Sequence, residues 1–293
     1  MGPQLATYQS LWAMEDLPFA AAQNWTLAER VEQIAAAGFT GLAVDLGARE
    51  APAAAALAPL AGAAGLRTAV FAFVSDDAGV DDALRYADTI GAPDLVVCAQ
   101  VFEADLAVVA DTVRRWHATA ARAGVTLQLE THRGTATNDL RATVRLLELL
   151  DPAIELAVDL SHHVCGCELP DEPTDVVEAL VAAVLARTGS IQGRVATRGQ
   201  VQVPLAFPQH ARWVDRFLGW WVAGFAAARV RRAAAGDARD IAFCAELGTR
   251  PYAITGADGR ELSDRWAEAL QLKEWAHECF AASAAPTEPR SRS

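Results

Sequence analysis

The chain has 293 residues, of which 52% are hydrophobic and 21% are charged. This length and composition suffice for one large buried core, and a single α/β barrel fits comfortably. The 37 acidic and 25 basic residues give a formal net charge of −12, whereas binding to nucleic acid needs a basic surface. We therefore expect no nucleic-acid partner.

Eight apolar runs with the character of strands alternate with eight helical patterns along the chain. The expected strands cover 6–13, 41–46, 67–74, 94–99, 126–130, 154–159, 190–195 and 241–247. The expected helices cover 25–37, 50–64, 78–90, 104–123, 137–150, 172–187, 208–234 and 262–282. Most of the strand runs are almost continuously apolar, which is typical of strands buried on both faces of a parallel sheet.

This alternation predicts a single (β/α)8 TIM barrel over residues 1–283. The final stretch, 284–293, has the composition of a disordered tail. A doubly wound nucleotide-binding sheet is disfavoured, because no G-x-G-x-x-G motif follows the first strand.

The cysteines and the N-terminus indicate the cellular compartment. Five cysteines form no even framework of disulfides. No N-terminal apolar stretch resembles a signal peptide, and proline and glycine interrupt the alanine-rich segment 51–65. We therefore expect a protein of the reducing cytoplasm that has no membrane partner.

A polar group with a metal-binding oxygen stands at the end of four expected strands. These groups are Glu130 in LQLETHRG, Asp159 in ELAVDLSHH, Gln192 in SIQGRV and Glu246 in IAFCAELG. Because the carboxyl ends of barrel strands meet at one mouth, the four groups should lie close together. Three carboxylates and an amide suit a hard divalent cation, so the sequence predicts a metal-dependent enzyme.

Each of the four groups also has a structural interpretation. Glu130 could form an ion pair with Arg133 at the rim, and Asp159 could cap the helix that follows it. The amide of Gln192 could form a hydrogen bond inside the barrel. Glu246 could be a purely structural buried carboxylate, although two glutamates on opposite sides of a substrate would make a proton-transfer pair.

Side chains near these strand ends are candidates for binding substrate. An arginine can hold a hydroxyl, carboxylate or phosphate oxygen by a forked contact. An imidazole can hydrogen-bond a substrate or carry a proton near neutral pH. The candidates are Trp12, His132, His162, Arg194, Arg198 and Tyr252.

An aromatic stretch, RFLGWWVAGF, lies in the expected helix 208–234. Its residues Phe217, Trp220 and Trp221, with the neighbouring Trp213, either pack against the barrel or form an exposed apolar stripe for a homodimer. Core packing is the favoured interpretation, and a homodimer stays open.

The arrangement resembles the xylose isomerase-like TIM-barrel superfamily of sugar phosphate isomerases and epimerases. The resemblance runs from AAAGFTGLAVDL to the final helix. Its most specific parts are ETHRG, the D-x-S-H string at 159–162, GRV at 193–195 and ELG-x-x-PY at 246–252.

The resemblance implies metal ligands at the four strand ends, with Glu130 and Glu246 also acting as the acid–base pair. It also implies that His162 and Arg198 hold the substrate. The sequence departs from the family at Gln192, because the family has histidine there. This departure puts the reaction in doubt more than the fold.

The leading hypothesis is a metal-dependent isomerase or epimerase of a small sugar-like polyhydroxy or keto substrate, which abstracts a proton to form an enediolate. The metal would be Mn, Co, Mg or a similar divalent ion that polarises the substrate oxygens. One alternative is a metal-dependent dehydratase or lyase, which begins with the same proton abstraction. Another alternative is a metal-free barrel that binds a ligand without turnover. Gln192 keeps this alternative open, because it stands where the family has a histidine ligand. The endonuclease branch of the superfamily is disfavoured by six histidines and the charge of −12.

Overall fold

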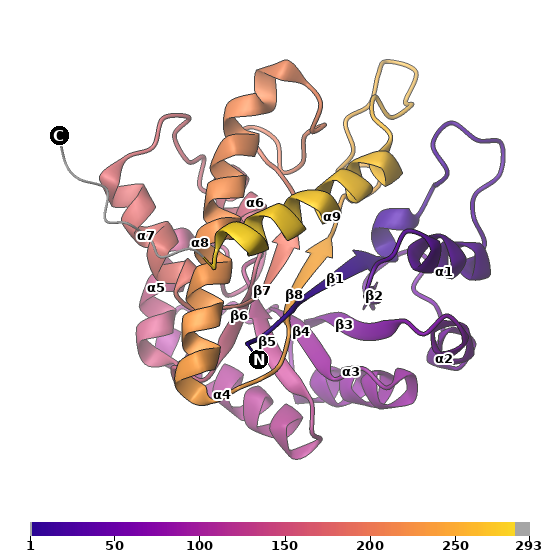
Figure 1. Ribbon diagram of the computed structural model, residues 1–293. Coiled ribbons are helices and arrows are strands. Elements are labelled where there is room, and N and C mark those ends of the chain that lie inside the picture. Colours follow the sequence, from indigo (N-terminus) through magenta and orange to yellow (C-terminus); the bar gives the residue numbers. More distant parts are fainter. Residues whose placement is uncertain (1, 285–293) are drawn as a thin grey trace.

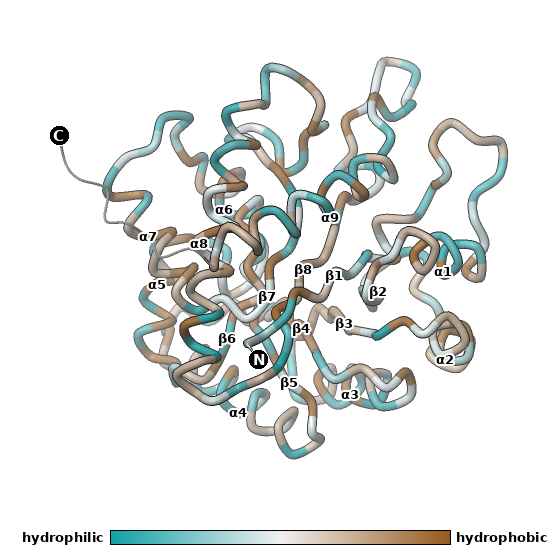
Figure 2. The backbone as a smooth tube through the Cα atoms, in the orientation of Figure 1, coloured by the Kyte–Doolittle hydropathy of each residue, from teal (hydrophilic) through white to brown (hydrophobic). Residues whose placement is uncertain are grey.

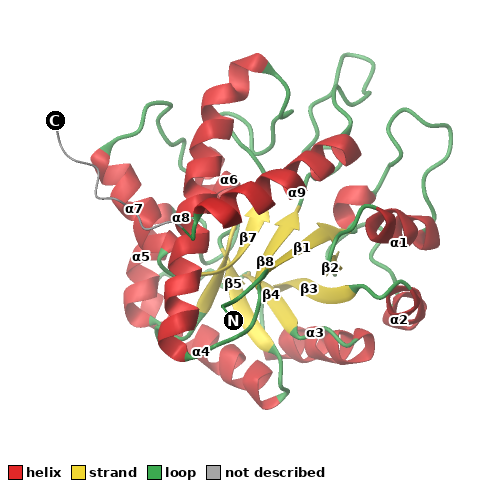
Figure 3. Ribbon diagram, in the orientation of Figure 1, coloured by secondary structure: helices red, strands yellow, loops and turns green. Residues whose placement is uncertain are grey.

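Eight parallel strands close into a barrel in the computed structural model, which describes residues 2–284 (Figures 1 and 3). In order around the barrel, the strands are β1 (Leu5–Ser10), β2 (Gly41–Asp45), β3 (Arg67–Val74), β4 (Asp94–Ala99), β5 (Thr126–Glu130), β6 (Glu155–Val158), β7 (Thr188–Gly193) and β8 (Ile241–Ala245). The predicted (β/α)8 barrel is confirmed.

Helices surround the strands on the outside of the barrel (Figure 3). The described α-helices are α1 (Leu27–Ala36), α2 (Ala54–Ala63), α3 (Asp77–Ile90), α4 (Leu106–Arg122), α5 (Leu140–Leu149), α6 (Leu160–Gly166), α7 (Asp175–Leu185), α8 (Ala211–Ala235) and α9 (Arg265–Ala282). Two short 3-10 helices, η1 (Trp12–Met14) and η2 (Pro208–His210), lie in loops.

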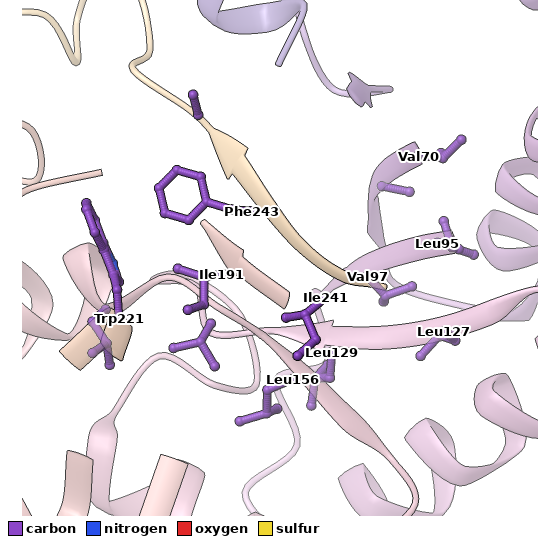
Figure 4. Close-up of a cluster of buried hydrophobic side chains, with 14 of the residues drawn as sticks. Val70, Leu95, Val97, Leu127, Leu129, Leu156, Ile191, Trp221, Ile241 and Phe243 are labelled. Atoms are coloured by element: carbon purple, nitrogen blue, oxygen red, sulfur yellow. The ribbon is translucent and has the colours of Figure 1, made fainter. Parts of the chain in front are cut away.

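The alternation of side chains along each strand gives the barrel two apolar layers. Outward-pointing side chains pack against the helices and form the main core; Figure 4 shows ten of its residues by label, among them Val97, Leu129, Ile191 and Phe243. Inward-pointing side chains form a smaller cluster in which alanines accompany Tyr8, Phe71, Val96 and Cys244. Because so many inward side chains are small, the barrel keeps a cavity near each end.

Local sequence explains where several helices begin and end. Thr26 and Glu29 form a capping box at the start of α1. Gly91 and Gly236 end α3 and α8 in the left-handed conformation, which glycine adopts without strain. Helices such as α3 and α4 carry both hydrophobic and hydrophilic residues (Figure 2), because one side packs on the barrel and the other faces solvent.

Two stretches differ from the expected elements. The first strand ends at Ser10 rather than at residue 13, and η1 takes its place. The expected helices leave 160–171 as a loop, yet the structure forms α6 there, directly after Asp159. Seven residues carry too few turns to give a helical period that the sequence would reveal.

The aromatic stretch of α8 packs against the barrel. Trp213, Phe217, Trp220 and Trp221 are all buried within this single chain, and Trp221 meets Phe243 of β8 edge-on at 5.2 Å. Core packing of these residues is confirmed, and they form no exposed stripe. The homodimer therefore stays a prediction with no support from this helix.

The loops that follow β1, β7 and β8 project from the same side of the barrel, at the upper edge of Figure 1. In parallel barrels this carboxyl end of the strands is where active sites are built. None of the described helices is long and apolar enough to cross a bilayer. The predicted tail falls almost entirely on 285–293, outside the described residues.

Candidate active site

Three carboxylates meet at the carboxyl end of the barrel. Glu130 is the last residue of β5, Asp159 directly follows β6, and Glu246 directly follows β8. One oxygen from each lies within 4.8 Å of the others, and all three side chains are buried. Three of the four predicted strand-end groups are thus brought together, over more than a hundred residues of sequence, by the closure of the barrel.

A buried arginine lies among these carboxylates. The Nη2 of Arg194 is 3.1 Å from Oδ2 of Asp159 and 3.3 Å from Oε1 of Glu246, and its side chain is 2% exposed. Burial acts to lower the pKa of Arg194, but the two carboxylates outweigh it and raise the pKa above the usual value. Arg194 therefore stays a guanidinium cation.

The strand register brings Arg194 to this level. Ser190, Gln192 and Arg194 are spaced two residues apart, so they point to the same, inner face of the barrel. Gln192 pairs with Cys244 of β8, so Arg194 lies beside Glu246, whose backbone N–H donates to the carbonyl of Gly193 at 3.2 Å.

A cavity of about 180 Å³ opens above the carboxylates. Eleven residues line it: Trp12, Asp45, Gly47, Phe71, Phe73, Cys98, Glu130, His132, Arg194, Glu246 and Tyr252. The rings of Trp12 and Tyr252 meet edge-on at 5.1 Å, and the guanidinium of Arg194 lies 5.6 Å and 5.1 Å from their centres. The cavity therefore combines charged groups with aromatic walls, as small-ligand sites commonly do.

The loops of the site are held by short hydrogen bonds to threonine hydroxyls. The backbone N–H of Asp159 donates to Oγ1 of Thr131 at 2.8 Å, and that hydroxyl donates to the carbonyl of Asp159 at 2.9 Å. The hydroxyl of Thr137 donates to the carbonyl of Glu130. Asp159 also caps α6, because its Oδ1 accepts from the N–H of Ser161, so its predicted capping role is confirmed alongside its place in the cluster.

The predicted histidines lie side by side next to the cluster. The rings of His132 and His162 are 3.7 Å apart, and His132 lines the cavity. Burial lowers the pKa of His132 to about 4 and that of His162 well below its usual value, with further lowering of the latter by His132 and Arg194. Both imidazoles are therefore neutral near pH 7, and the 3.5 Å contact of His162 with Asp159 is a polar contact rather than an ion pair.

Burial also raises the pKa of each carboxyl in the cluster. The pKa of Glu130 lies well above its usual value because of burial and the nearby Glu246. Burial raises the pKa of Glu246 to about 8 against the opposing effect of Arg194. Burial also raises the pKa of Asp159, although Arg194 and Ser161 act to lower it. Carboxyls that carry a proton near neutral pH are suited to acid–base work.

Two predicted site residues are not brought into this cavity. Gln192 lines a separate cavity of about 270 Å³ toward the other end of the barrel, and its amide Nε2 lies 3.5 Å from the hydroxyl of Ser190. Arg198 has a side chain that is 51% exposed and forms an ion pair with Glu168 at 3.4 Å. Neither residue contacts the three carboxylates through any described hydrogen bond or ion pair.

Asp45 and Cys98 also line the cavity, although neither is among the site residues predicted from the sequence. Asp45 ends β2, in the apolar run GLAVD, so the rule that found Asp159 also applies to it. Cys98 ends no such run, but its thiol donates to Oε2 of Glu130 at 2.9 Å. The pairing of β4 with β5, in which Val97 lies opposite Leu129, brings the two side chains together.

The carboxylates have the donor type of a divalent-cation site, and Glu130, His132 and His162 form a second group with that capacity. Arg194 counts against a resident ion. An ion bound to Asp159 and Glu246 would lie about 2.0–2.6 Å from their oxygens, where the buried guanidinium would face it as a like charge. At about 4 Å and an effective dielectric constant of about 20, that repulsion is roughly 8 kcal/mol. The group of three carboxylates therefore does not fit a divalent ion while Arg194 holds this position.

Comparison with known proteins supports the fold. Neither a protein-family model nor a curated protein matches the sequence. A solved L-ribulose 3-epimerase is 16% identical, with a TM-score of 0.57 over 99% of this chain and 100% of its own. A xylose isomerase-like TIM-barrel protein from Mycobacterium smegmatis, in complex with magnesium, is 14% identical, with a TM-score of 0.59 over 97% and 98%.

A third solved structure, a probable 3-DHS dehydratase from Bacillus anthracis, is 12% identical, with a TM-score of 0.56 over 92% of this chain and 98% of its own. The likeness to these structures extends over nearly the whole chain. The resemblance to xylose isomerase-like barrels is therefore confirmed at the level of the fold.

Proposed function

We propose that this protein is an isomerase or epimerase that moves a proton between neighbouring carbons of a small sugar-like polyhydroxy or keto substrate. The observation that carries the proposal is that Glu130 and Glu246 reach one buried cavity from different strands. The likeness to an L-ribulose 3-epimerase supports the same reaction class. Aromatic walls formed by Trp12 and Tyr252 suit the apolar faces of a sugar-like molecule.

The two glutamates divide the proton transfer. One carboxylate removes the proton from a carbon next to a carbonyl, and the resulting enediolate places negative charge on the substrate oxygens. The other carboxyl returns a proton to the neighbouring carbon or to the opposite face. Arg194 lies 3.3 Å from Glu246 and presents positive charge in the same cavity, where it offsets the charge that develops on oxygen.

A dehydratase or lyase is the second candidate function. It begins with the same proton abstraction and then expels a leaving group, and the likeness to a probable 3-DHS dehydratase favours keeping it. A barrel that binds a ligand without turnover is the remaining alternative.

The divalent metal (Mn, Co, Mg or a similar ion) stays a prediction. The three carboxylates and the magnesium bound to one structural neighbour support it, whereas the position of Arg194 opposes it. No step of the proposed proton transfer depends on the ion.

Exchange of substrate hydrogen with deuterated water tests the proposed function. A panel of small ketoses, aldoses and 2-keto acids is incubated with the protein, and deuterium in the recovered compounds is measured by mass spectrometry. We expect exchange with at least one compound, and a loss of roughly 10²–10⁴-fold in Glu246→Gln and in Glu130→Gln. The matched control is Glu32→Gln, which changes an exposed glutamate of α1. Undiminished exchange in both site variants would refute the assignment.

A further inference from the structure

We infer that the guanidinium of Arg194 takes the place of a divalent cation in this barrel, so that this side chain neutralises the carboxylates and holds the substrate oxygens. The inference concerns the charges of Arg194 and of the three carboxylates beside it. Its metal-excluding part stands independently of the reaction, whereas its substrate-holding part rests on the proposed function.

Arg194 and an ion would compete for the same oxygens. One nitrogen, Nη2, contacts Asp159 and Glu246 together, at 3.1 Å and 3.3 Å. Those two carboxylates and Glu130 are the only described group of three acidic side chains whose oxygens converge to within 4.8 Å. A metal ion needs the same convergence, so the guanidinium must leave before an ion can use all three.

The surroundings of Arg194 oppose its departure. Its side chain is 2% exposed, and it rises from β7 inside the barrel. Its guanidinium is in cation–π range of both Trp12 and Tyr252. Trp12 is itself closely seated, because a Cβ at Gly248 would lie 2.0 Å from a carbon of its ring. An arginine cannot lose its charge to make room, because its guanidinium stays protonated in proteins.

Two donors of Arg194 remain available for a ligand. Its Nε and Nη1 are buried and have no hydrogen-bond partner among residues 2–284, and Arg194 lines the cavity. Leaving such donors unpaired is costly, so a bound molecule should supply acceptors. These two N–H groups lie on different edges of the guanidinium plane, so they would bind two separate acceptors. We therefore expect a ligand with several oxygen acceptors, as a polyhydroxy carbonyl compound has.

The proton transfer balances without any further reactant. The base forms an O–H bond with the substrate proton, and the C–H electron pair becomes the C=C bond of the enediolate. The carbonyl π electrons move to oxygen, where the N–H donors of Arg194 hold the oxyanion. In an isomerisation, the second carboxyl protonates the former carbonyl carbon, the proton of the neighbouring hydroxyl moves to the former carbonyl oxygen, and the carbonyl re-forms on the neighbouring carbon. In an epimerisation, the second carboxyl protonates the original carbon on its opposite face, and the carbonyl re-forms where it was. No group is oxidised or reduced overall.

Binding of Mn²⁺ to chelator-treated protein tests the inference directly. The wild type, Arg194→Gln and the control Arg145→Gln, which changes an exposed arginine of α5, are titrated while free Mn²⁺ is followed by electron paramagnetic resonance. We expect Arg194→Gln to bind one Mn²⁺ at least about 100-fold more tightly than the wild type, since it keeps the carboxylates and loses the competing charge. Mn²⁺ should raise the Tm of Arg194→Gln only.

If Arg194→Gln does not fold, Mn²⁺ binding by the wild type still decides the test. Stoichiometric, micromolar binding of Mn²⁺ by the wild type would overturn the inference, as would equal affinity in the folded variant. Arg194→Lys, which keeps a positive charge, should exclude Mn²⁺ as the wild type does.

Hydrogen exchange in the presence of a chelator separates this inference from the proposed function. Exchange that persists in the chelated wild type and is lost in Arg194→Gln supports both. Exchange that needs added Mn²⁺ refutes the inference and leaves the function standing. Absence of exchange with every compound, together with absence of Mn²⁺ binding, refutes the function and leaves the exclusion of metal standing.

Discussion

The two ends of the barrel hold their charged side chains in opposite ways. At the N-terminal end, Arg67 pairs with Asp240 at 2.8 Å, and both Arg232 and Arg239 pair with Asp237. Arginines there match or outnumber these carboxylate partners, and Arg67 and Arg239 reach solvent, whereas Arg232 is buried. At the carboxyl end, three buried carboxylates share one guanidinium.

This difference separates stability from function. Charges paired at a rim cost little, because water and a partner both solvate them. Carboxylates buried with too few partners are costly to keep, and a ligand that offers compensating groups would offset that cost. The proposed active site lies at the carboxyl end of the strands, where barrels of this fold carry their active sites.

The largest expected difference between the two ends is in activity. Glu130→Gln at the carboxyl end should lower hydrogen exchange by roughly 10²–10⁴-fold, because it removes one member of the proton-transfer pair. Asp240→Asn at the N-terminal end should leave the exchange rate unchanged. The measurement is the initial rate of deuterium uptake with the best compound of the panel. Equal losses in both variants would erase the functional distinction between the ends.

A smaller effect on stability and KM is expected from adding a methyl group at Gly248, which lies against the ring of Trp12. In Gly248→Ala, the added Cβ would lie 2.0 Å from a carbon of the Trp12 ring, so the ring must shift and the cavity that it lines must change shape. We expect a loss of about 1–3 kcal/mol in the free energy of unfolding and a higher KM. The control is Gly62→Ala, at an exposed helical position with no heavy atom within 4 Å, which should stabilise by about 0.5–1 kcal/mol. A Gly248→Ala variant with wild-type KM and stability would show that Trp12 is not held there.

The two ends should also respond to pH in opposite directions. Burial raises the pKa of Glu246 from 4.5 to about 8, so between these values the folded state binds more protons than the unfolded state. The stability that this group contributes is therefore present at low pH and is lost as the pH rises through that window. For Asp237, contacts with Arg239 and Arg232 outweigh burial and lower the pKa. Its contribution is present above the unfolded pKa and is lost as the pH falls.

Urea unfolding over a range of about pH 3 to pH 8 measures both slopes. Compared with the wild type, Glu246→Gln should lose less stability between about pH 5 and pH 8. Asp237→Asn should lose less on the acidic side. Parallel curves for the wild type and Glu246→Gln would show that Glu246 does not titrate in this window.

The smallest effect is expected at the rim of the N-terminal end. Arg67 and Asp240 are 43% and 31% exposed, so their ion pair is screened by water. Asp240→Asn should reduce the free energy of unfolding by less than about 1 kcal/mol, and high salt should reduce the difference further. A loss several times larger, insensitive to salt, would mean that this end also depends on buried charge.

Most of the barrel could be predicted from the sequence, because a strand buried on both faces leaves an apolar run that ends at polar loop residues. The exceptions were local. η1 continued the apolar pattern of the first strand, and α6 was too short to show a helical period. A polar residue at the end of an apolar strand was the signal that identified Glu130, Asp159 and Glu246. Asp45 carries the same signal at the end of β2 and lines the same cavity.

The choice between Gln192 and Arg194 could not be made from the sequence. Both residues point into the barrel, and the sequence favoured the amide as the oxygen ligand. The pairing of β7 with β8 carries Gln192 toward the second cavity and Arg194 to the carboxylates. The position of Arg198 could not be predicted from the sequence either, because it lies in a loop, where its side chain is exposed and pairs with Glu168.

By itself, the sequence determined the order of the strands, the kind of barrel and the acidic character of its carboxyl end, since these depend on local patterns of apolar and polar residues. Only the tertiary structure decided which cation those acids meet. Register and barrel closure are set by contacts between strands that are distant in the sequence. Two residues separate the amide of Gln192, in β7, from the guanidinium of Arg194, directly after β7. That spacing places Arg194, rather than Gln192, beside the carboxylates.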